Sequence, residues 1–208
     1  MNASAKNCVK GRGCGNGHRP THPALDPVGS DVMNPVEPLY RRDPDAWRRH
    51  LAEGNATQPR KRVGADALVF DPHGRILLVD PNYKPDWDLP GGMAEANEPP
   101  DAAVCRELAE ELGLHIATPA VKMLCLDWVS PHGPWDDSLM FIFDAGILDA
   151  HQVTTLQITD HELDAFEFCT TEQATERLRP YVWSRVGAAL HARETNRTAY
   201  LHDGKEIW

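Results

Sequence analysis

Three glutamates near the middle of the sequence, Glu107, Glu110 and Glu111, have the spacing of neighbours on one side of a helix. Successive helical residues are rotated by about 100°, so the three side chains fall within an arc of about 100°. Like charges on adjacent turns destabilise a helix unless something neutralises them. Hard divalent cations prefer oxygen ligands, and Mg²⁺ keeps positions open for water and phosphate oxygens. The spacing therefore predicts a site for Mg²⁺, with Mn²⁺ as the alternative.

The helix that carries these glutamates is expected from about Pro100 to Leu112, where Gly113 ends it. Its aliphatic residues, Val104 and Leu108 among them, fall on the side next to the carboxylates. One helix can therefore bury an apolar face in the core while it presents acidic groups to a site.

Two further features could position these carboxylates. Arg106 lies beside the glutamates and can hold Glu98, from the preceding loop, through a bidentate pair. In that loop, Pro90-Gly91-Gly92 allows positive φ and the close approach of a backbone carbonyl to a metal or a phosphate.

Residues 92–114 resemble the Nudix box, Gly-x5-Glu-x7-Arg-Glu-U-x-Glu-Glu-x-Gly-U with U aliphatic, and every fixed position matches. A chance match at seven fixed positions in a chain of this length is negligible. The resemblance extends more loosely over about residues 62–195. It implies an α/β/α sandwich around a mixed central sheet. It also implies Mg²⁺-dependent hydrolysis of a phosphoanhydride bond in a nucleoside triphosphate, or in a nucleoside diphosphate linked to another group, such as ADP-ribose or a nucleotide sugar.

The resemblance further implies roles for particular residues. The metal ligands would be three glutamates and one backbone carbonyl, at Glu107, Glu110, Glu111 and Gly91. Arg106 and Glu98 would orient them. Glu107 is the first choice for the carboxylate that activates water. Glu162 is the second, because it precedes an expected strand at a place where the family often has an extra acidic residue.

Three other side chains are candidates for binding substrate. Trp128 and Trp135 flank a loop that could overhang the site, where an indole could stack on a base, although packing in the core or at the rim explains them equally well. Lys84 could contact a phosphate or could be a solvated loop lysine.

Two alternatives to the hydrolase remain open. A nucleotide-binding sensor of the same fold would bind without turnover, which the intact glutamates disfavour. An isomerase of the same fold acting on an isoprenoid diphosphate would want a reactive cysteine in the cleft. Cys105 is unsuited, because it lies on the aliphatic side of the helix.

Composition limits the partners. The formal net charge of -10 disfavours binding to nucleic acids or to anionic membranes. No apolar run approaches the roughly 20 residues that a membrane helix needs, and no secretory signal is present, so a cytoplasmic location is expected. Five cysteines, three of them in apolar patterns, indicate free thiols. A small-molecule nucleotide is the expected partner; a homodimer is possible, but no interface signature supports it.

The chain divides into three expected parts: a disordered arm over 1–38, a short helix with a linker over 39–61, and the domain over 62–208. The arm contains Cys8, Cys14, His18 and His22, whose spacing is poor for zinc. Asp43 and Pro44 predict the start of the short helix, which would stop at Gly54. In the domain we expect strands at Val63–Phe70, Arg75–Asp80, Val121–Val129, Leu139–Phe143 and Leu163–Phe168, helices at Thr171–Leu178 and Pro180–Thr195, and a closing hairpin around Asp203-Gly204.

Overall fold

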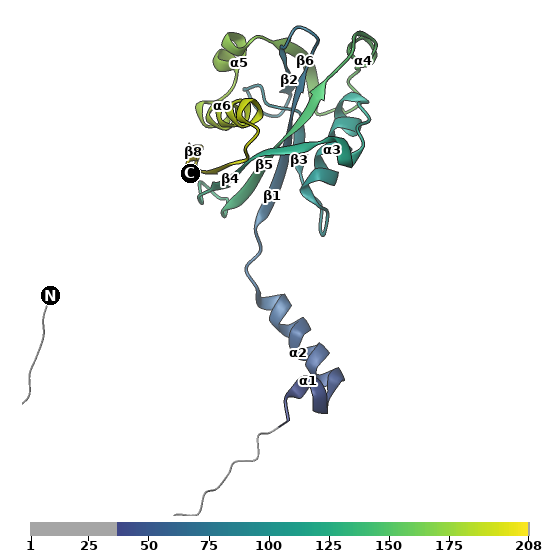
Figure 1. The fold of residues 1–208 in the computed structure, drawn as a ribbon, viewed down its shortest axis with the longest axis vertical. Helices are drawn as coiled ribbons and strands as arrows, with labels where there is room; N and C mark the ends of the chain where they lie inside the picture. Colours follow the sequence, from purple (N-terminus) through teal and green to yellow (C-terminus); the bar gives the residue numbers. More distant parts are fainter. Residues whose placement is uncertain (1–36, 208) are drawn as a thin grey trace, which may run out of the picture. The chain divides into compact units, whose positions relative to one another are not determined.

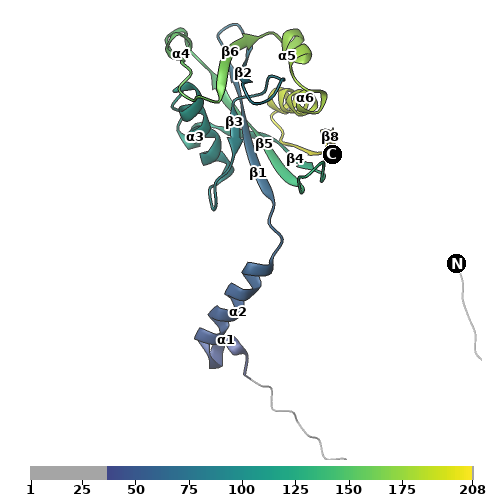
Figure 2. The ribbon, with the colours of Figure 1, turned by 180° about the vertical axis from the view of Figure 1, so that it is seen from behind.

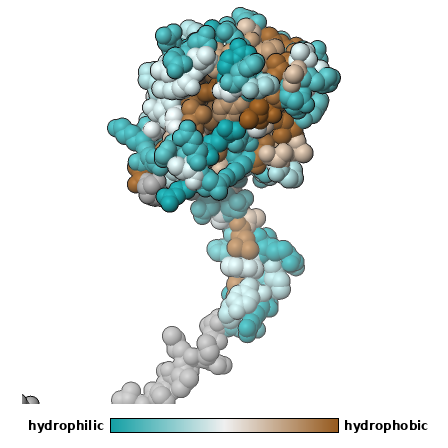
Figure 3. Space-filling view, turned by 45° about the horizontal axis from the view of Figure 1, so that its top comes forward, coloured by the Kyte–Doolittle hydropathy of each residue, from teal (hydrophilic) through white to brown (hydrophobic). Residues whose placement is uncertain are grey.

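The computed structural model describes residues 37–207, which belong to two units divided after Gln58. The described part of the first unit contains the helices α1 (Leu39–Arg42) and α2 (Pro44–Thr57). Asp43 caps α2 by accepting a hydrogen bond from the Ala46 N–H at 2.9 Å, as the sequence predicts, and the helix continues past Gly54. Figure 3 shows apolar residues on the surface of this segment, where Leu51 is half exposed. The cysteines and histidines of the expected arm lie outside the described residues.

The second unit is built on one mixed sheet of eight strands in the described residues, in the order β6-β2-β1-β5-β4-β7-β8, with β3 also paired to β1. The pairs β1–β5 and β4–β7 are parallel, and the others are antiparallel. The strands are β1 (Arg62–Phe70), β2 (Ile76–Pro81), β3 (Gly91–Met93), β4 (Lys122–Val129), β5 (Ser138–Ile147), β6 (Leu163–Cys169), β7 (Ala199–His202) and β8 (Lys205–Glu206).

Helices cover both faces of this sheet (Figures 1 and 2). The helices α3 (Pro100–Leu112) and α4 (Ala150–Thr155) lie on one face, and α5 (Thr171–Arg177) and α6 (Pro180–Thr195) lie on the other. A 3₁₀ turn, η1 (Thr118–Ala120), precedes β4. The arrangement is the expected α/β/α sandwich around a mixed sheet.

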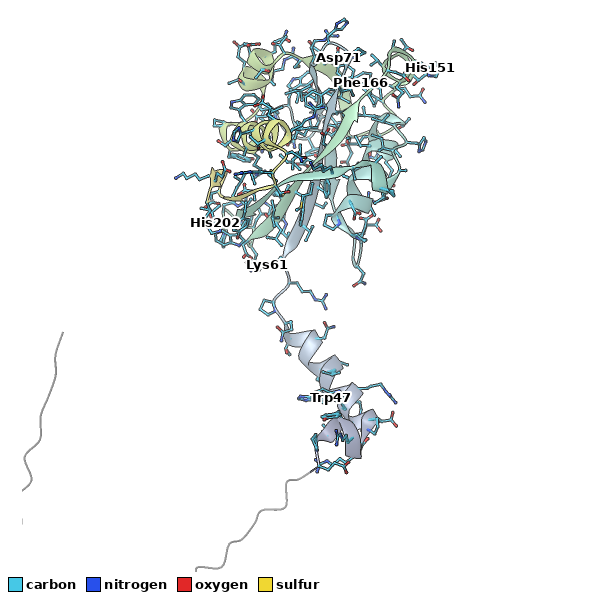
Figure 4. The ribbon with its side chains drawn as sticks, in the orientation of Figure 1. Trp47, Lys61, Asp71, His151, Phe166 and His202 are labelled. Atoms are coloured by element: carbon cyan, nitrogen blue, oxygen red, sulfur yellow. The ribbon has the colours of Figure 1, made fainter. Side chains whose placement is uncertain are left out.

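Strand β1 shows how the sequence supplies both core layers. It crosses the unit between Lys61 and Asp71, which flank its two ends (Figure 4). Alternate residues point to opposite faces of a strand, so Ala65 and Val69 pack in the cluster with α3, whereas Leu68 packs in the cluster with α5 and α6. The same alternation places Asp66 on the α6 face.

The predicted elements are present with adjusted ends. Strand β5 extends four residues beyond the predicted Phe143, to Ile147, and the hairpin β7–β8 turns at Asp203 and Gly204 as expected. Helix α4 and strand β3 were not predicted. The three cysteines of the second unit are free thiols. No helix within residues 37–207 has both the length and the apolar character needed to cross a membrane.

Candidate active site

Helix α3 carries the glutamates and holds the loop before it. Oε2 of Glu111 accepts a hydrogen bond from the N–H of Gly91 at 3.0 Å. Val104, Leu108 and Leu112 are fully buried under the sheet, which fixes the orientation of the helix. The apolar face therefore determines which way the acidic face points, as the sequence predicts.

Steric constraints explain both glycines of the loop. Gly91 has φ 141°, and a Cβ added there would lie 2.4 Å from the carbonyl oxygen of Ala65 in the neighbouring strand β1. A Cβ on Gly92 would lie 2.5 Å from Oε1 of Glu107. Only residues without a side chain allow β3 to pair with β1 while the Glu107 carboxylate packs directly on the backbone.

Arg106 holds three carboxylates at once. Its Nε and Nη2 donate to the two oxygens of Glu98 at 2.9 and 3.0 Å, which is the bidentate pair expected from the sequence. Its Nη1 donates to Glu107 at 3.0 Å and to Glu110 at 2.8 Å, and Nη2 also donates to the Met93 carbonyl at 3.2 Å. The guanidinium thus ties the loop to the helix.

The donor chemistry of this cluster suits a hard cation, but the three glutamates do not converge in the structure. Glu107 and Glu111 both lie against the Gly91-Gly92 backbone. Glu110 is 55% exposed and is directed to Arg106 instead. Within the described residues no group of three acidic, histidine or cysteine side chains is close enough to hold a metal ion. The side chain of Glu110 would have to leave Arg106 to join the other two.

The pKa values of the acidic groups differ with their burial and their partners. Burial, together with the charges of Glu107 and Asp66, raises the pKa of Glu111 to about 8, although the hydrogen bond from the Gly91 N–H opposes the rise. Burial also raises the pKa of Glu107, whereas the hydrogen bonds from Arg106 lower the pKa of Glu98. Burial is therefore the largest cause of both raised values, and the neighbouring carboxylates add to it.

A cavity of about 560 Å³ opens beside this loop, on the α6 face of the sheet. Gly91, Gly92 and Glu111 line one side of it. Its other walls come from the segment before β3, the loop between β4 and β5, and the first turns of α6; they include Tyr83, Lys84, Asp88, Ser130, His132, Trp135, Arg179, Tyr181 and Arg185. The carboxylates of α3 therefore border a space large enough for a nucleotide-sized ligand.

The structure brings some of the candidate binding residues to the cavity. Trp135 lines it, is 53% exposed, and has the Arg62 guanidinium over its ring at 4.4 Å. Lys84 also lines it and donates to Asp88 at 2.6 Å.

Two other candidates lie elsewhere. Trp128 does not line the cavity, because its Nε1 donates to Asp137 at 2.9 Å and its ring contacts His202. Glu162 is exposed in the turn before β6 and does not line the cavity either. The charge of Asp160, in the same turn, raises the pKa of Glu111.

The sequence patterns do not indicate several of the cavity residues. Asp66 lies on the cavity wall; burial and the nearby charge of Asp88 raise its pKa to about 7. The signal that could have found it is a single acidic residue within the apolar strand Val63–Phe70. The cavity residues Tyr181 and Arg185 are one turn apart on α6, a spacing that by itself indicates only a shared helix face.

Comparison with known proteins agrees with this geometry. The family model described as "NUDIX domain" matches residues 60–187. A MutT-like protein of Streptomyces ambofaciens is 25% identical over 154 residues, covering 72% of this chain and 88% of the relative. An 8-oxo-dGTP diphosphatase of Proteus vulgaris is 34% identical over 56 residues, covering 25% of this chain and 50% of the relative. The chain spans half or less of this and three further curated relatives.

Among solved structures, the NUDIX domain of Shewanella oneidensis NrtR complexed with ADP ribose superposes with a TM-score of 0.54 at 20% identity, covering 70% of this chain and 97% of that one. At this identity the likeness supports the fold. The family match covers more than half of the chain and includes the loop and helix described above. The chain therefore belongs to the NUDIX family and is a Nudix hydrolase.

Proposed function

We propose that this protein hydrolyses a phosphoanhydride bond in a nucleoside triphosphate, or in a nucleoside diphosphate linked to another group, with Mg²⁺ or Mn²⁺ as its cofactor. The observation that carries the proposal is the placement of Glu107 and Glu111 against the Gly91-Gly92 backbone at the side of the large cavity. Clustered oxygen ligands beside a ligand-sized space are what a metal-assisted attack on a diphosphate requires.

The residues of the box divide into two roles in this proposal. The side chains of Glu107, Glu110 and Glu111 and the carbonyl of Gly91 would hold the cation, and Arg106 and Glu98 would orient these ligands. The bound cation would neutralise phosphate oxygens and lower the pKa of a water molecule. Glu107 is the proposed base, because its carboxylate lies on the loop backbone and burial raises its pKa. Glu162 stays a second choice.

The names of relatives suggest which substrates to test first. One relative is named 8-oxo-dGTP diphosphatase, another RNA pyrophosphohydrolase, and the NrtR domain was solved with ADP ribose. The negative net charge of the chain favours a small nucleotide over a long nucleic acid. We place the enzyme in the cytoplasm and keep a homodimer as a possibility that size-exclusion chromatography can test.

The decisive experiment is a panel assay with product identification. The panel comprises nucleoside triphosphates, 8-oxo-dGTP, ADP-ribose and a UDP-sugar, each with Mg²⁺, with Mn²⁺ and with a chelator. We expect turnover that requires a divalent cation and that falls about 10²- to 10⁴-fold in Glu107→Gln. The matched control is Glu176→Gln, which changes an exposed glutamate of α5. Binding without turnover across the panel would overturn the proposal and favour the sensor.

A further inference from the structure

A buried ion pair stands at the wall of the cavity, away from the box glutamates. Asp127 of β4 is fully buried, and Arg185 of α6 keeps only 7% of its side chain exposed. Nε of Arg185 donates to Oδ2 of Asp127 at 2.6 Å. A buried ion pair is tolerated only where further hydrogen bonds satisfy the carboxylate. The N–H of Gly204 supplies them, at 3.1 Å from each oxygen of Asp127.

This arrangement fixes Arg185 from two directions. Helix α6 supplies the side chain, and the turn of the β7–β8 hairpin locks its partner. The hairpin turn is also hydrogen-bonded to another cavity residue, because Oδ1 of Asp203 accepts hydrogen bonds from the N–H and the hydroxyl of Ser130. Residues 199–206 lie beyond the matched family region, and Asp203 of this hairpin lines the cavity.

The terminal nitrogens of Arg185 are left free by these contacts. Neither donates a hydrogen bond to any residue in the described range. Among the described residues, Nε of Arg179 is the one fully buried side-chain nitrogen without a hydrogen-bond partner, so the terminal nitrogens of Arg185 are not fully enclosed. Arg185 itself lines the cavity. Arg185 therefore offers the cavity a planar fork of N–H donors whose Nε is held by Asp127.

The surroundings decide which ligand group such a fork fits. Asp127 already balances the charge of Arg185, so the site does not require another anion. Asp66 and Asp203 line the same cavity, and two of its other cationic groups, Lys84 and Arg179, are already paired with Asp88. The neighbouring side chains offer flat and apolar contacts: the Tyr181 ring lies 5.4 Å from the guanidinium carbon, and Met140 and Val182 line the cavity as well.

A neutral, flat ring with two adjacent acceptor atoms meets all of these conditions. Among purines, guanine presents O6 and N7 as a pair of acceptors, which an arginine engages in bidentate fashion. Adenine presents N7 beside an amino group, and its donor would oppose the donors of Arg185.

We propose that Arg185 is a specificity-determining residue that binds the O6/N7 edge of a 6-oxopurine nucleotide, while Asp127 and Gly204 position it. This proposal concerns recognition of the base. It rests on the proposed function only where hydrolysis is used to measure the preference for that base. Phosphates would lie toward Glu111, which lines the same cavity.

The first test compares nucleotides that differ only in the base, in whichever phosphate form the panel shows to be the best substrate. We expect kcat/KM for guanosine and inosine nucleotides to exceed that for adenosine by roughly 5- to 150-fold, the range that a good bidentate contact supplies. The 7-deazaguanosine nucleotide lacks only the N7 acceptor and should lose at least about fivefold with the unaltered protein. Equal kcat/KM for the guanosine, inosine, adenosine and 7-deazaguanosine nucleotides would overturn the proposal.

The second test uses a matched pair of variants on α6. Arg185→Lys keeps the charge but loses the fork, so the guanosine-to-adenosine ratio should fall toward one through a loss on guanosine alone. Arg193→Lys alters an arginine on the same helix that pairs with Asp144 at 2.8 Å and does not line the cavity, so the ratio should not change. Equal losses on both nucleotides in Arg185→Lys would indicate a purely structural role and would refute the proposal.

A binding measurement separates this inference from the proposed activity. Calorimetry with non-hydrolysable guanosine and adenosine triphosphate analogues needs no turnover. Tighter binding of the guanosine analogue supports the base preference even if no nucleotide is hydrolysed. Hydrolysis of many nucleotides with no such difference in affinity would leave the hydrolase standing and would reject the role of Arg185.

Discussion

The backbone N–H of Gly91 donates to the carboxylate of Glu111, twenty residues further along the chain, at 3.0 Å. This contact joins the last turn of α3 to strand β3, which pairs in turn with β1. The candidate metal site is therefore braced by the sheet and does not depend on the loop alone. The next residue, Gly92, lies directly under the carboxylate of Glu107. Gly91 thus contacts Glu111 and Gly92 contacts Glu107, and the sequence spacing of these residues allows both contacts.

The closeness of Gly92 to Glu107 predicts a severe effect of a single methyl group. In Gly92→Ala the new Cβ would lie 2.5 Å from Oε1 of Glu107 and displace that carboxylate. We expect kcat to fall about 100-fold, because displacements of about 1 Å at a reacting centre cost that much. Gly187→Ala in α6 is the control, since nothing lies within 4 Å of its Cβ position. Steady-state kinetics with circular dichroism checks this, and an active, folded Gly92→Ala would contradict it.

The raised pKa of Glu111 predicts a pH-dependent stability of the metal-free protein. The folded protein keeps a proton on this carboxyl up to about pH 8, whereas the unfolded chain releases it near 4.5. The free energy of unfolding should therefore fall as the pH rises between these values. Glu111→Gln removes this ionisation. The melting temperature of the variant minus that of the unaltered protein should therefore increase from pH 5 to pH 8.5, with both measured in the presence of a chelator. A pH-independent difference would contradict this, and Glu176→Gln serves as the control.

The fork of Arg106 predicts that lysine cannot replace it. A lysine cannot donate in parallel to both oxygens of Glu98 while it also reaches Glu107 and Glu110. We expect the apparent affinity for Mg²⁺ to fall about 10- to 100-fold in Arg106→Lys, as is typical when groups that orient metal ligands are changed. Metal titrations of activity measure this. Arg75→Lys, at an arginine–aspartate pair in the β1–β2 turn, should leave the affinity unchanged.

The exposed indole of Trp135 at the cavity predicts a contribution to substrate binding. Arg62 lies over the ring at 4.4 Å and holds it at the wall. If a base stacks there, Trp135→Leu should raise KM by about 2- to 12-fold, which corresponds to the roughly 0.5–1.5 kcal/mol of an aromatic pair, with little change in kcat. Trp47→Leu, in the first unit, should change neither constant. An unchanged KM in Trp135→Leu would assign the indole to the rim alone.

Local patterns predicted the main elements of the domain because the information lies within each segment. The apolar spacing of α3, its glycine stop and the Arg106–Glu98 pair all depend on residues close in sequence. Strand β3 escaped prediction because three residues, two of them glycine, carry no period, and the strand forms only by pairing with β1. The spacing predicts the side of the helix on which Glu110 lies. It does not predict the hydrogen bond from Arg106 to Glu110, because that bond depends on the conformations of the two side chains.

The cavity was harder to predict because its walls come from distant segments. Arg185 and Asp127 are 58 residues apart, and neither suggests the other. Trp128 and Trp135 looked equivalent as neighbours of one loop. The first belongs to β4 and bonds to Asp137, and the second lies beyond the strand and reaches the cavity. Which of two similar residues faces a ligand depends on strand ends, and these are set by pairing across the sheet.

The β7–β8 hairpin also covers the edge of the sheet that β4 would otherwise expose to other molecules. Without β7, the strand Lys122–Val129 would present unpaired backbone groups along a largely apolar edge. Proteins discourage such edges from pairing with other chains by ending their sheets in short, charged strands. Here the last strand is Lys205–Glu206, two exposed and charged residues. Shortening the chain before Ala199 would therefore open a template for self-association, and insoluble protein would be the first sign of it.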